Sequence, residues 1–245
     1  MIRTLRWIAG VGLVTGIASL AIAFTLGGFN LRDMWDRGRF NLQACGDDKG
    51  AAGAASERRL AWRGGDAIEI AVPSTVRLRM GDGSDIVVRG PAHAISHVGV
   101  RGNRLVLDCR WPASSRDIEV VLPGKAFRKI GISGSARVQL EGLNQPELAL
   151  RISGSGSVQA RGTVDRLSLK VSGSGDGRFA DLALKSLDLK ISGSGDVEAA
   201  PKEEADVSIS GSGTLRLLSQ PARMKTHIAG SGRVLQPAVE ANEKK

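Results

Sequence analysis

Aromatic side chains are nearly missing from this chain of 245 residues. They make up 4% of it, tyrosine is absent, and Phe179 is the only aromatic residue between positions 128 and 235. Unpaired bases and the flat faces of sugar rings are usually held on aromatic side chains. The shortage argues against both kinds of ligand on this stretch, and we expect no nucleic-acid partner.

Cysteine and histidine are also few, with two cysteines and three histidines in the whole chain. His93 and His97 have the spacing of zinc ligands on one helix face, but Pro91 favours a loop there and no acidic or cysteine ligand stands beside them. No nucleophile with a nearby base and no phosphate-binding loop is recognisable. The sequence therefore predicts a protein without catalytic residues, metal or cofactor.

The N-terminus contains a long uncharged stretch. Arg3 and Arg6 precede a mostly apolar run over residues 7–29. A helix of that length spans a bilayer, and arginines on its short leading side predict that this end stays in the cytoplasm while the rest is exported. Ala21 and Ala23 also fit a signal-peptide cleavage site. Residues 1–29 are thus either a transmembrane anchor, which the length of the run favours, or a cleaved signal peptide.

If the chain is exported, its two cysteines can form a disulfide and its positive charge can meet anionic material of the envelope. In an exported chain two cysteines most simply form one disulfide, here between Cys45 and Cys109, and two unpaired thiols are the alternative. The net charge of +9 favours contact with anionic partners such as acidic glycans or lipid head groups. A basic surface that only keeps the protein soluble is the alternative.

Glycine, by contrast, is abundant at 32 residues, and many of these belong to a repeat. The motif Ile-Ser-Gly-Ser-Gly or a close variant occurs six times, with its first glycines at positions 134, 154, 173, 193, 211 and 230. A regular period of 18–20 residues is typical of units that stack on one another. The residues before each motif alternate, as in Leu148-Ala149-Leu150-Arg151-Ile152, which predicts a strand with one apolar face.

Stacked strands of this kind predict an all-β fold, a right-handed parallel β-helix of about six rungs. We expect two short strands in each rung, apolar columns inside the coil, and neighbouring strands roughly 4.8 Å apart. In the motif, glycines permit the unusual backbone angles and close chain approach of a tight corner, and serines bond to nearby backbone. The motif is therefore interpreted as structural, and no helix is expected after residue 30.

These repeated units, preceded by Val120-Val121-Leu122-Pro123 and Ile130-Gly131-Ile132, resemble the putative auto-transporter adhesin head GIN domain family. The resemblance covers roughly residues 60–236, and a repeated motif makes it specific. It implies a bacterial exported protein with a β-helical domain. It implies no catalytic residue, because the family has no established activity.

We accordingly divide the chain into four parts. Residues 1–29 are the signal peptide or anchor, 30–58 a flexible tether, 59–236 the β-helix domain, and 237–245 a disordered tail. The expected location is the bacterial cell envelope, with residues 7–29 in the inner membrane and the domain in the periplasm. If the segment is cleaved, the protein is instead periplasmic or secreted.

One row of outward-facing positions is the candidate anion-binding site. Its members are Arg151, Lys170, Lys190, Ser208 and His227. Stacked cations would attract a repeating anionic polymer or a membrane surface. The adjoining row holds Asp188 and Asp206, which would instead neutralise the cations if the two rows paired. The row predicts a non-catalytic binding or scaffolding module that contacts anionic envelope polymers or a protein partner.

Asp176 and Asp196 support the alternative, a polysaccharide-active β-helix enzyme. They follow the motif in adjacent units, so their carboxylates would lie about 5 Å apart, as in a retaining glycosidase. The same column holds Ser157 and Thr214, and no aromatic residue stands nearby to position a sugar. The missing positioning groups favour the binding module over the enzyme.

Overall fold

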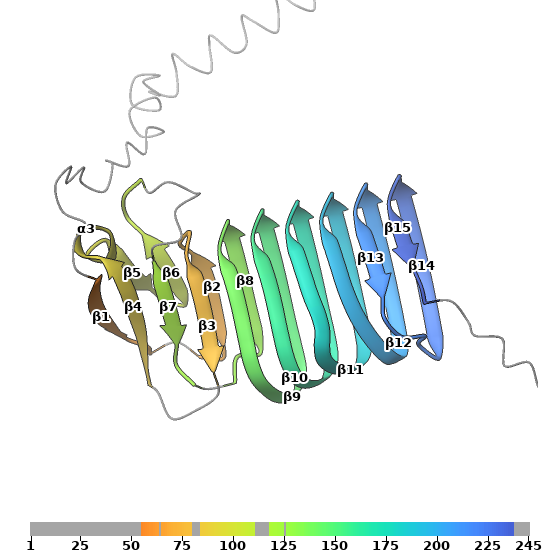
Figure 1. Cartoon of the computed structure of the whole chain (residues 1–245), viewed down its shortest axis with the longest axis horizontal. Helices are drawn as coiled ribbons and strands as arrows, with labels where there is room; N and C mark the ends of the chain where they lie inside the picture. The colour runs from red at the N-terminus through yellow and green to blue at the C-terminus, as the bar shows by residue number, and fades with distance from the viewer. Residues whose placement is uncertain (1–54, 64, 80–83, 111–117, 125, 238–245) are drawn as a thin grey trace, which may run out of the picture. The chain divides into compact units, whose positions relative to one another are not determined.

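The computed structural model describes residues 55–63, 65–79, 84–110, 118–124 and 126–237. The regular structure in these ranges is nearly all β, and the repeats form a solenoid of parallel strands, as predicted (Figure 1). It has about five turns, because the six copies of the motif mark the two ends of five complete turns. The predicted membrane segment and Cys45 lie outside the described residues, as do most of the tether and of the C-terminal tail.

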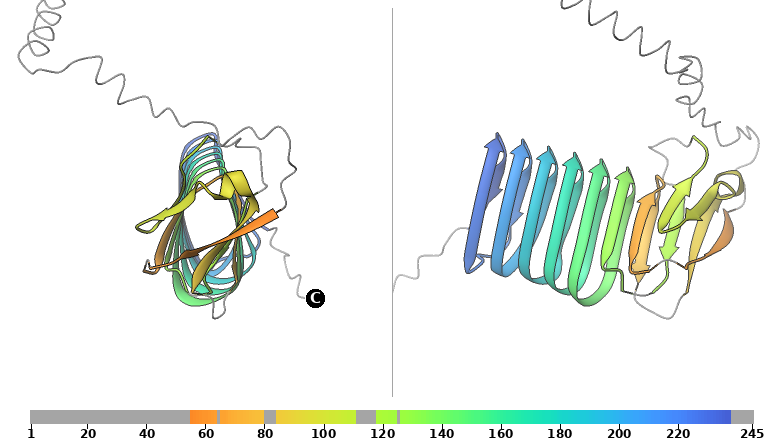
Figure 2. Two further views of the ribbon diagram at one scale, coloured as in Figure 1. Left: turned by 90° about the vertical axis from the view of Figure 1, so that its left-hand side faces the viewer. Right: turned by 180° about the vertical axis from the view of Figure 1, so that it is seen from behind.

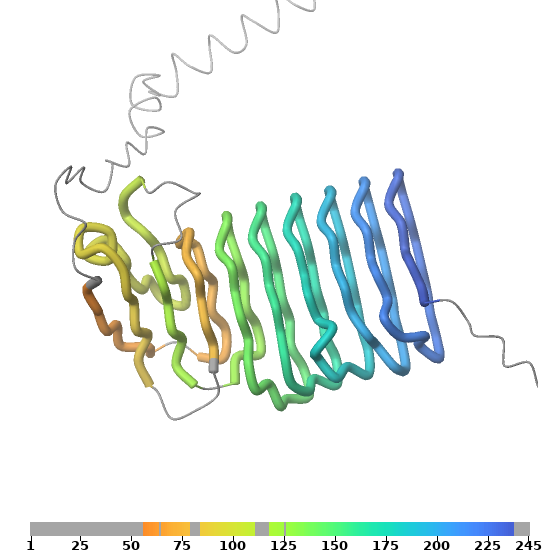
Figure 3. Tube along the Cα trace, viewed as in Figure 1, coloured from red at the N-terminus to blue at the C-terminus, as the bar shows by residue number. Residues whose placement is uncertain are grey.

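The strands of the solenoid are longer than predicted. Where the sequence suggested two short strands in each unit, the structure has single strands of 16–18 residues that bend around the edge opposite the motif (Figure 3). The register shifts at this bend, for example between Ala160 and Gly162, but pairing with the adjacent strand resumes beyond it. In chain order the repeat strands are β8 (Lys129–Gly134), β9 (Arg137–Gly154), β10 (Ser157–Gly173), β11 (Asp176–Gly193), β12 (Asp196–Gly211), β13 (Thr214–Leu217), β14 (Arg223–Gly230) and β15 (Arg233–Leu235).

Each turn contributes to two faces of the coil. Face A is built from the stretches that lead into the motif, residues 129–134, 147–154, 166–173, 186–193, 204–211 and 223–230. Face B is built from the stretches that leave it, residues 137–141, 157–160, 176–179, 196–199, 214–217 and 233–235. Equivalent residues stand opposite one another in adjacent strands, so Ser172 pairs with both Ser153 and Ser192. The repeat period thus becomes columns that run along the axis.

The core lies between the two faces. On both sides of the bend, inward residues of the long strands are buried and alternate with outward ones, and the inward columns of face A are apolar up to the last turn, as in Leu169, Leu189 and Val207. Phe179 is fully buried on face B. At the bend, the Nε2 of Gln145 donates to the carbonyl oxygens of Phe127 (3.0 Å) and Glu147 (2.8 Å), so this amide fastens the chain as it enters face A.

The serine-glycine motif forms the corner between the faces, as predicted. The first glycine of each copy has a positive φ, 116° at Gly173, which side chains rarely adopt. The second glycine is excluded from substitution by space alone, because a Cβ at Gly175 would lie 2.5 Å from Ile152 Cγ2 and 2.8 Å from the Gly156 carbonyl oxygen. Successive corners therefore approach more closely than any residue with a side chain permits.

The strands before the repeats do not follow chain order. β2 (Ala67–Ala71) pairs with β8 on face A and β3 (Thr75–Arg79) pairs with β9 on face B, although about fifty residues separate β3 from β8 in sequence. β6 (Arg104–Leu107) and β7 (Glu119–Leu122) then add parallel strands to β2 and β3. The parallel coil thus continues past β2 and β3 to β6 and β7, and its turns at this end do not follow chain order.

Antiparallel strands close the N-terminal end. β4 (Asp85–Pro91) pairs with β7, β5 (Val98–Arg101) pairs with β6, and β1 (Ala55–Ala61) pairs with β4, all antiparallel. Figure 2 (left) looks along the coil and shows β1, in orange, lying across this end. The expectation of no helix was wrong for one short segment, α3 (Ala92–Ile95). Arg58 holds it in place by donating from one terminal nitrogen to the carbonyl oxygens of Ile95 (3.1 Å), Ser96 (2.6 Å) and Val98 (3.1 Å).

Candidate binding face

The predicted row of cations is a single column on face A. Lys170 stands opposite Arg151 on one side and Lys190 on the other, and Ser208 and His227 continue the column in β12 and β14. Arg151, Lys170, Lys190 and His227 are all exposed. Because neighbouring strands lie roughly 4.8 Å apart, the first three charges form a line with that repeat along the axis. We call Arg151, Lys170 and Lys190 the cation column.

The described residues form no ion pair with the cation column. Within the ranges that the structure describes, no carboxylate lies within 4.0 Å of a nitrogen of Arg151, Lys170 or Lys190. Some other cations on the same domain are paired, as in Lys185–Asp165 (2.9 Å) and Arg161–Asp181 (3.1 Å). The alternative in which the two rows pair is therefore not how these side chains lie.

The surroundings of the cation column are polar and asymmetric. Asp188 and Asp206 stand opposite one another in the adjoining column, two residues before Lys190 and Ser208 on their strands. On the other side runs the column of motif serines, Ser153, Ser172, Ser192 and Ser210. A ligand on the cation column would thus have hydroxyl groups along one side and two carboxylates near one end. Such a line can hold regularly spaced anions, which bind weakly one at a time and strongly together.

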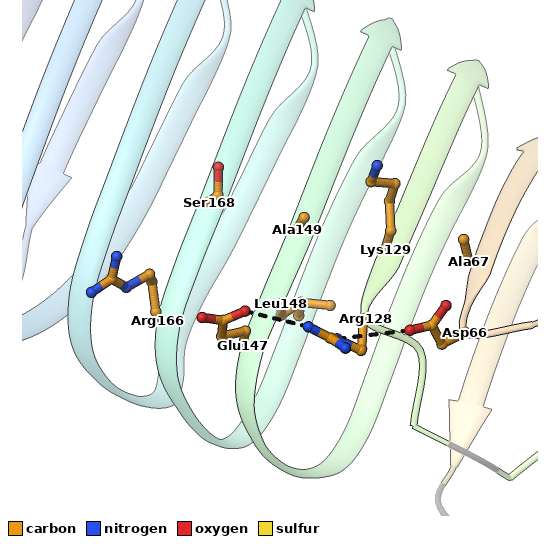
Figure 4. A pocket seen from close by; sticks show the side chains of 9 residues that line it. All are labelled: Asp66, Ala67, Arg128, Lys129, Glu147, Leu148, Ala149, Arg166 and Ser168. Atoms are coloured by element: carbon orange, nitrogen blue, oxygen red, sulfur yellow. Dashed lines mark ion pairs between the residues drawn. The ribbon is translucent and has the colours of Figure 1, made fainter.

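A shallow depression of about 370 Å³ lies on the same face toward the bend (Figure 4). Arg128 crosses it between Asp66 and Glu147, 3.7 Å from each carboxylate. Lys129 and Arg166 also line it, as does Ser168, which precedes Lys170 by two residues on β10. Sequence reasoning missed this depression, because Asp66 and Arg128 precede the strands of the repeat and no period relates them to the column.

Asp176 and Asp196 do come together on face B. They begin adjacent strands, β11 and β12, and both line a depression of about 480 Å³ with Thr214, Arg178 and Arg216. None of the described residues that line this depression is aromatic. The two residues are therefore neighbours in adjacent turns, but the depression lacks the flat apolar surface on which an enzyme would position a sugar ring.

His93, His97 and Cys109 are the remaining candidates from the sequence that fall in the described ranges. His93 lies in α3, whereas His97 follows that helix, and no group of three or more histidine, cysteine, aspartate or glutamate side chains in the described ranges could hold a metal ion. Cys109 is buried, and its predicted partner Cys45 lies outside the described residues, so the disulfide stays a prediction. In the part of the chain that the structure covers, no helix combines the length and apolar character needed to cross a membrane.

Comparison with known families identifies the domain. Residues 66–221 match the family model described as "Putative auto-transporter adhesin, head GIN domain". The chain belongs to this family. The matched range runs from the residue before β2 to the loop after β13, so it contains the first five copies of the motif and the closing strands β4 and β5, but not β1 or the last turn. An adhesin-like family of this kind indicates an exported or envelope protein of bacteria. No curated protein matches the chain.

A solved structure of a putative adhesin shares the fold. The domain is similar to a putative adhesin from Bacteroides fragilis, with 18% identity and a TM-score of 0.59 over 75% of this chain and 97% of that one. It is also similar to a putative adhesin from Parabacteroides merdae, with 15% identity, a TM-score of 0.45, and 77% and 98% coverage. A third similar structure, titled a putative lipid binding protein from Parabacteroides distasonis, has 17% identity, a TM-score of 0.44, and 76% and 98% coverage. At these identities the likeness concerns the fold alone.

Proposed function

We propose that this GIN-domain protein is a non-catalytic binding module of the bacterial cell envelope, and that it holds a linear anionic polymer along the cation column. Residues 7–29 anchor it in the inner membrane, with the solenoid in the periplasm. The observation that carries the proposal is the alignment of Arg151, Lys170 and Lys190 in one column without carboxylate partners in the described structure.

Electrostatics favours a polymeric ligand. Like charges that stand directly opposite one another on neighbouring strands are destabilising, so the cation column costs the free domain some stability. Anions placed along the column remove that cost at all three positions. A single exposed ion pair contributes at most about 1 kcal/mol, so a small anion would bind weakly. A chain that carries several linked anions adds these contacts without repeating the entropic cost of association.

The test is a binding titration with charge-reversal variants. The full-length protein in detergent is titrated with fluorescent dextran sulfate, and uncharged dextran is the polymer control. The R151E/K170E/K190E variant should lose at least about tenfold in affinity, since each reversal turns an attraction into a repulsion.

The matched control is R137E/R178E/R216E, which makes the same change in net charge with exposed residues of face B. It should bind dextran sulfate almost as tightly as the natural sequence. Equal losses in the two triple variants would show that only overall charge matters and would contradict the proposal. Circular dichroism of both variants establishes that the solenoid is intact.

The adjacency of Asp176 and Asp196 supports a second candidate, a polysaccharide-cleaving enzyme. If it were correct, the full-length protein would release new reducing ends from an envelope polysaccharide, and D176N/D196N would abolish that release. We expect no release from either protein. Release by the natural sequence alone would replace the binding proposal with the enzymatic one.

A further inference from the structure

The two ends of the solenoid differ. The N-terminal end is closed by the antiparallel strands β1, β4 and β5, and by α3, which Arg58 fastens to the end of the coil. At the other end β14 pairs only with β12 and β15 only with β13, so each presents one edge without a neighbouring strand in the described structure (Figure 1). Unpaired backbone groups along such an edge can accept another strand.

Apolar side chains gather at this open end. The large apolar side chains that the described ranges leave exposed are Leu218, Ile228 and Leu235, and all three lie in or beside the last turn. Ile228 occupies an inward column and is 40% exposed, whereas Ile209, one turn earlier in that column, is 0% exposed. The difference arises because no further turn covers the last one. A strand added beside β14 would bury Ile228 as β14 buries Ile209.

The positive charge of this end favours an acidic partner. From position 214 to position 237 the chain has four lysines and arginines and no aspartate or glutamate. Arg223, Lys225 and His227 alternate along the exposed side of β14, and Arg233 begins β15. A second copy of this end would place cations opposite cations, which is destabilising, whereas carboxylates would be attracted.

We propose that the open end binds an extended, acidic segment of a partner polypeptide, which adds to β14 as a further strand. Main-chain hydrogen bonds to the free edge provide affinity, and alternate side chains provide specificity. The apolar side chains of the segment cover Ile228, and its acidic side chains lie beside Lys225 and His227. The inference is independent of the cation column, which lies on the outer surface of the earlier turns.

Peptide binding to the full-length protein in detergent tests this proposal. The probe is a labelled eight-residue peptide of alternating valine and glutamate, which matches the length of β14. We expect saturable binding of this peptide, and at least about tenfold weaker binding of the valine-lysine peptide and of a valine-glutamate peptide N-methylated at alternate residues. Equal binding of the N-methylated peptide would overturn the proposal, because such a peptide cannot form the backbone ladder.

Variants locate the site. K225E/H227E should weaken binding of the valine-glutamate peptide at least about tenfold, whereas R137E/R178E, which places two glutamates on face B, should leave it unchanged. Deletion of residues 238–245 should also leave the affinity for the peptide unchanged. A higher affinity after the deletion would show that the chain's own tail occupies the open end. A dimer in analytical ultracentrifugation that K225E/H227E dissociates would show that a second copy of the chain occupies the open end. Either result would overturn the proposal.

Discussion

The corners of the solenoid allow backbone strain and close approach to be measured separately. Gly134 has a φ of 98°, and a Cβ added there would have nothing within 4 Å, so alanine meets only an unfavourable backbone conformation. Gly175 has no positive φ, but a Cβ there would lie 2.5 Å from Ile152 Cγ2. Gly173 combines both obstacles, with a φ of 116° and the Gly154 carbonyl oxygen 2.6 Å from the added atom.

G173A should therefore cost more than either of the other two substitutions. G134A should lower the free energy of unfolding by about 1–3 kcal/mol, the cost of a residue in a rarely populated backbone region. G175A should lower it by about 1–3 kcal/mol, the usual cost of an extra group in a packed interior. G173A should cost about 2–6 kcal/mol if the two effects add at one position. G99A is the matched control, because Gly99 has open space and no positive φ, and it should be nearly neutral.

Urea denaturation of the four variants, followed by far-ultraviolet circular dichroism, measures these differences. The order of stability predicted is G99A above G134A and G175A, with G173A lowest. If G134A cost as much as G173A, close approach of the corners would contribute nothing. If G175A were neutral, the adjacent turns would be free to move apart and the corner would not be tightly packed.

Other predictions concern the core and the N-terminal end. F179A should lower the free energy of unfolding by about 3–5 kcal/mol in the same urea experiment, because Phe179 is fully buried; a loss below about 1 kcal/mol would place it outside the core. R58A should lower the free energy of unfolding by about 1.5–3 kcal/mol and should speed amide hydrogen exchange in α3 more than in the solenoid strands. An equal increase in exchange throughout the domain would show that Arg58 does not hold the helix. The hydrogen bonds from Arg89 and Arg59 lower the pKa of Glu57. The contribution of Glu57 to stability is therefore present above its unfolded-state pKa and is lost as the pH falls through the lowered folded-state pKa. The difference in unfolding free energy between the natural sequence and E57Q should therefore vanish in acid, and a difference that grew as the pH fell would contradict this sign.

The repeat made most of the solenoid predictable from sequence. The period of the motif determined which residues stack, so the column from Arg151 to His227 could be written down in advance, and the glycines marked its corners. The bend opposite the corner was not predictable as continuous strand, because the register shifts there and the apolar alternation is interrupted.

The N-terminal end could not be predicted in the same way. No period relates β2 to β8, so their pairing across the intervening strands leaves no trace in the local pattern. Residues Ala92–Ile95 are too few for a helical period, and α3 depends instead on the carbonyl contacts of a distant arginine, Arg58. The ion pairs of Arg128 with Asp66 and Glu147 were likewise unpredictable, because Asp66 and Arg128 lie outside the repeated sequence.

The most direct test of the central claim is a footprint of the bound polymer. Lysine acetylation of the full-length protein, quantified by mass spectrometry with and without dextran sulfate, reports how accessible each amine is. Lys170 and Lys190 are exposed and belong to the cation column, whereas Lys202 is also exposed but lies at the bend. The account predicts that dextran sulfate slows acetylation of Lys170 and Lys190 and leaves Lys202 unchanged. Equal protection of all three lysines, or of none, would contradict it.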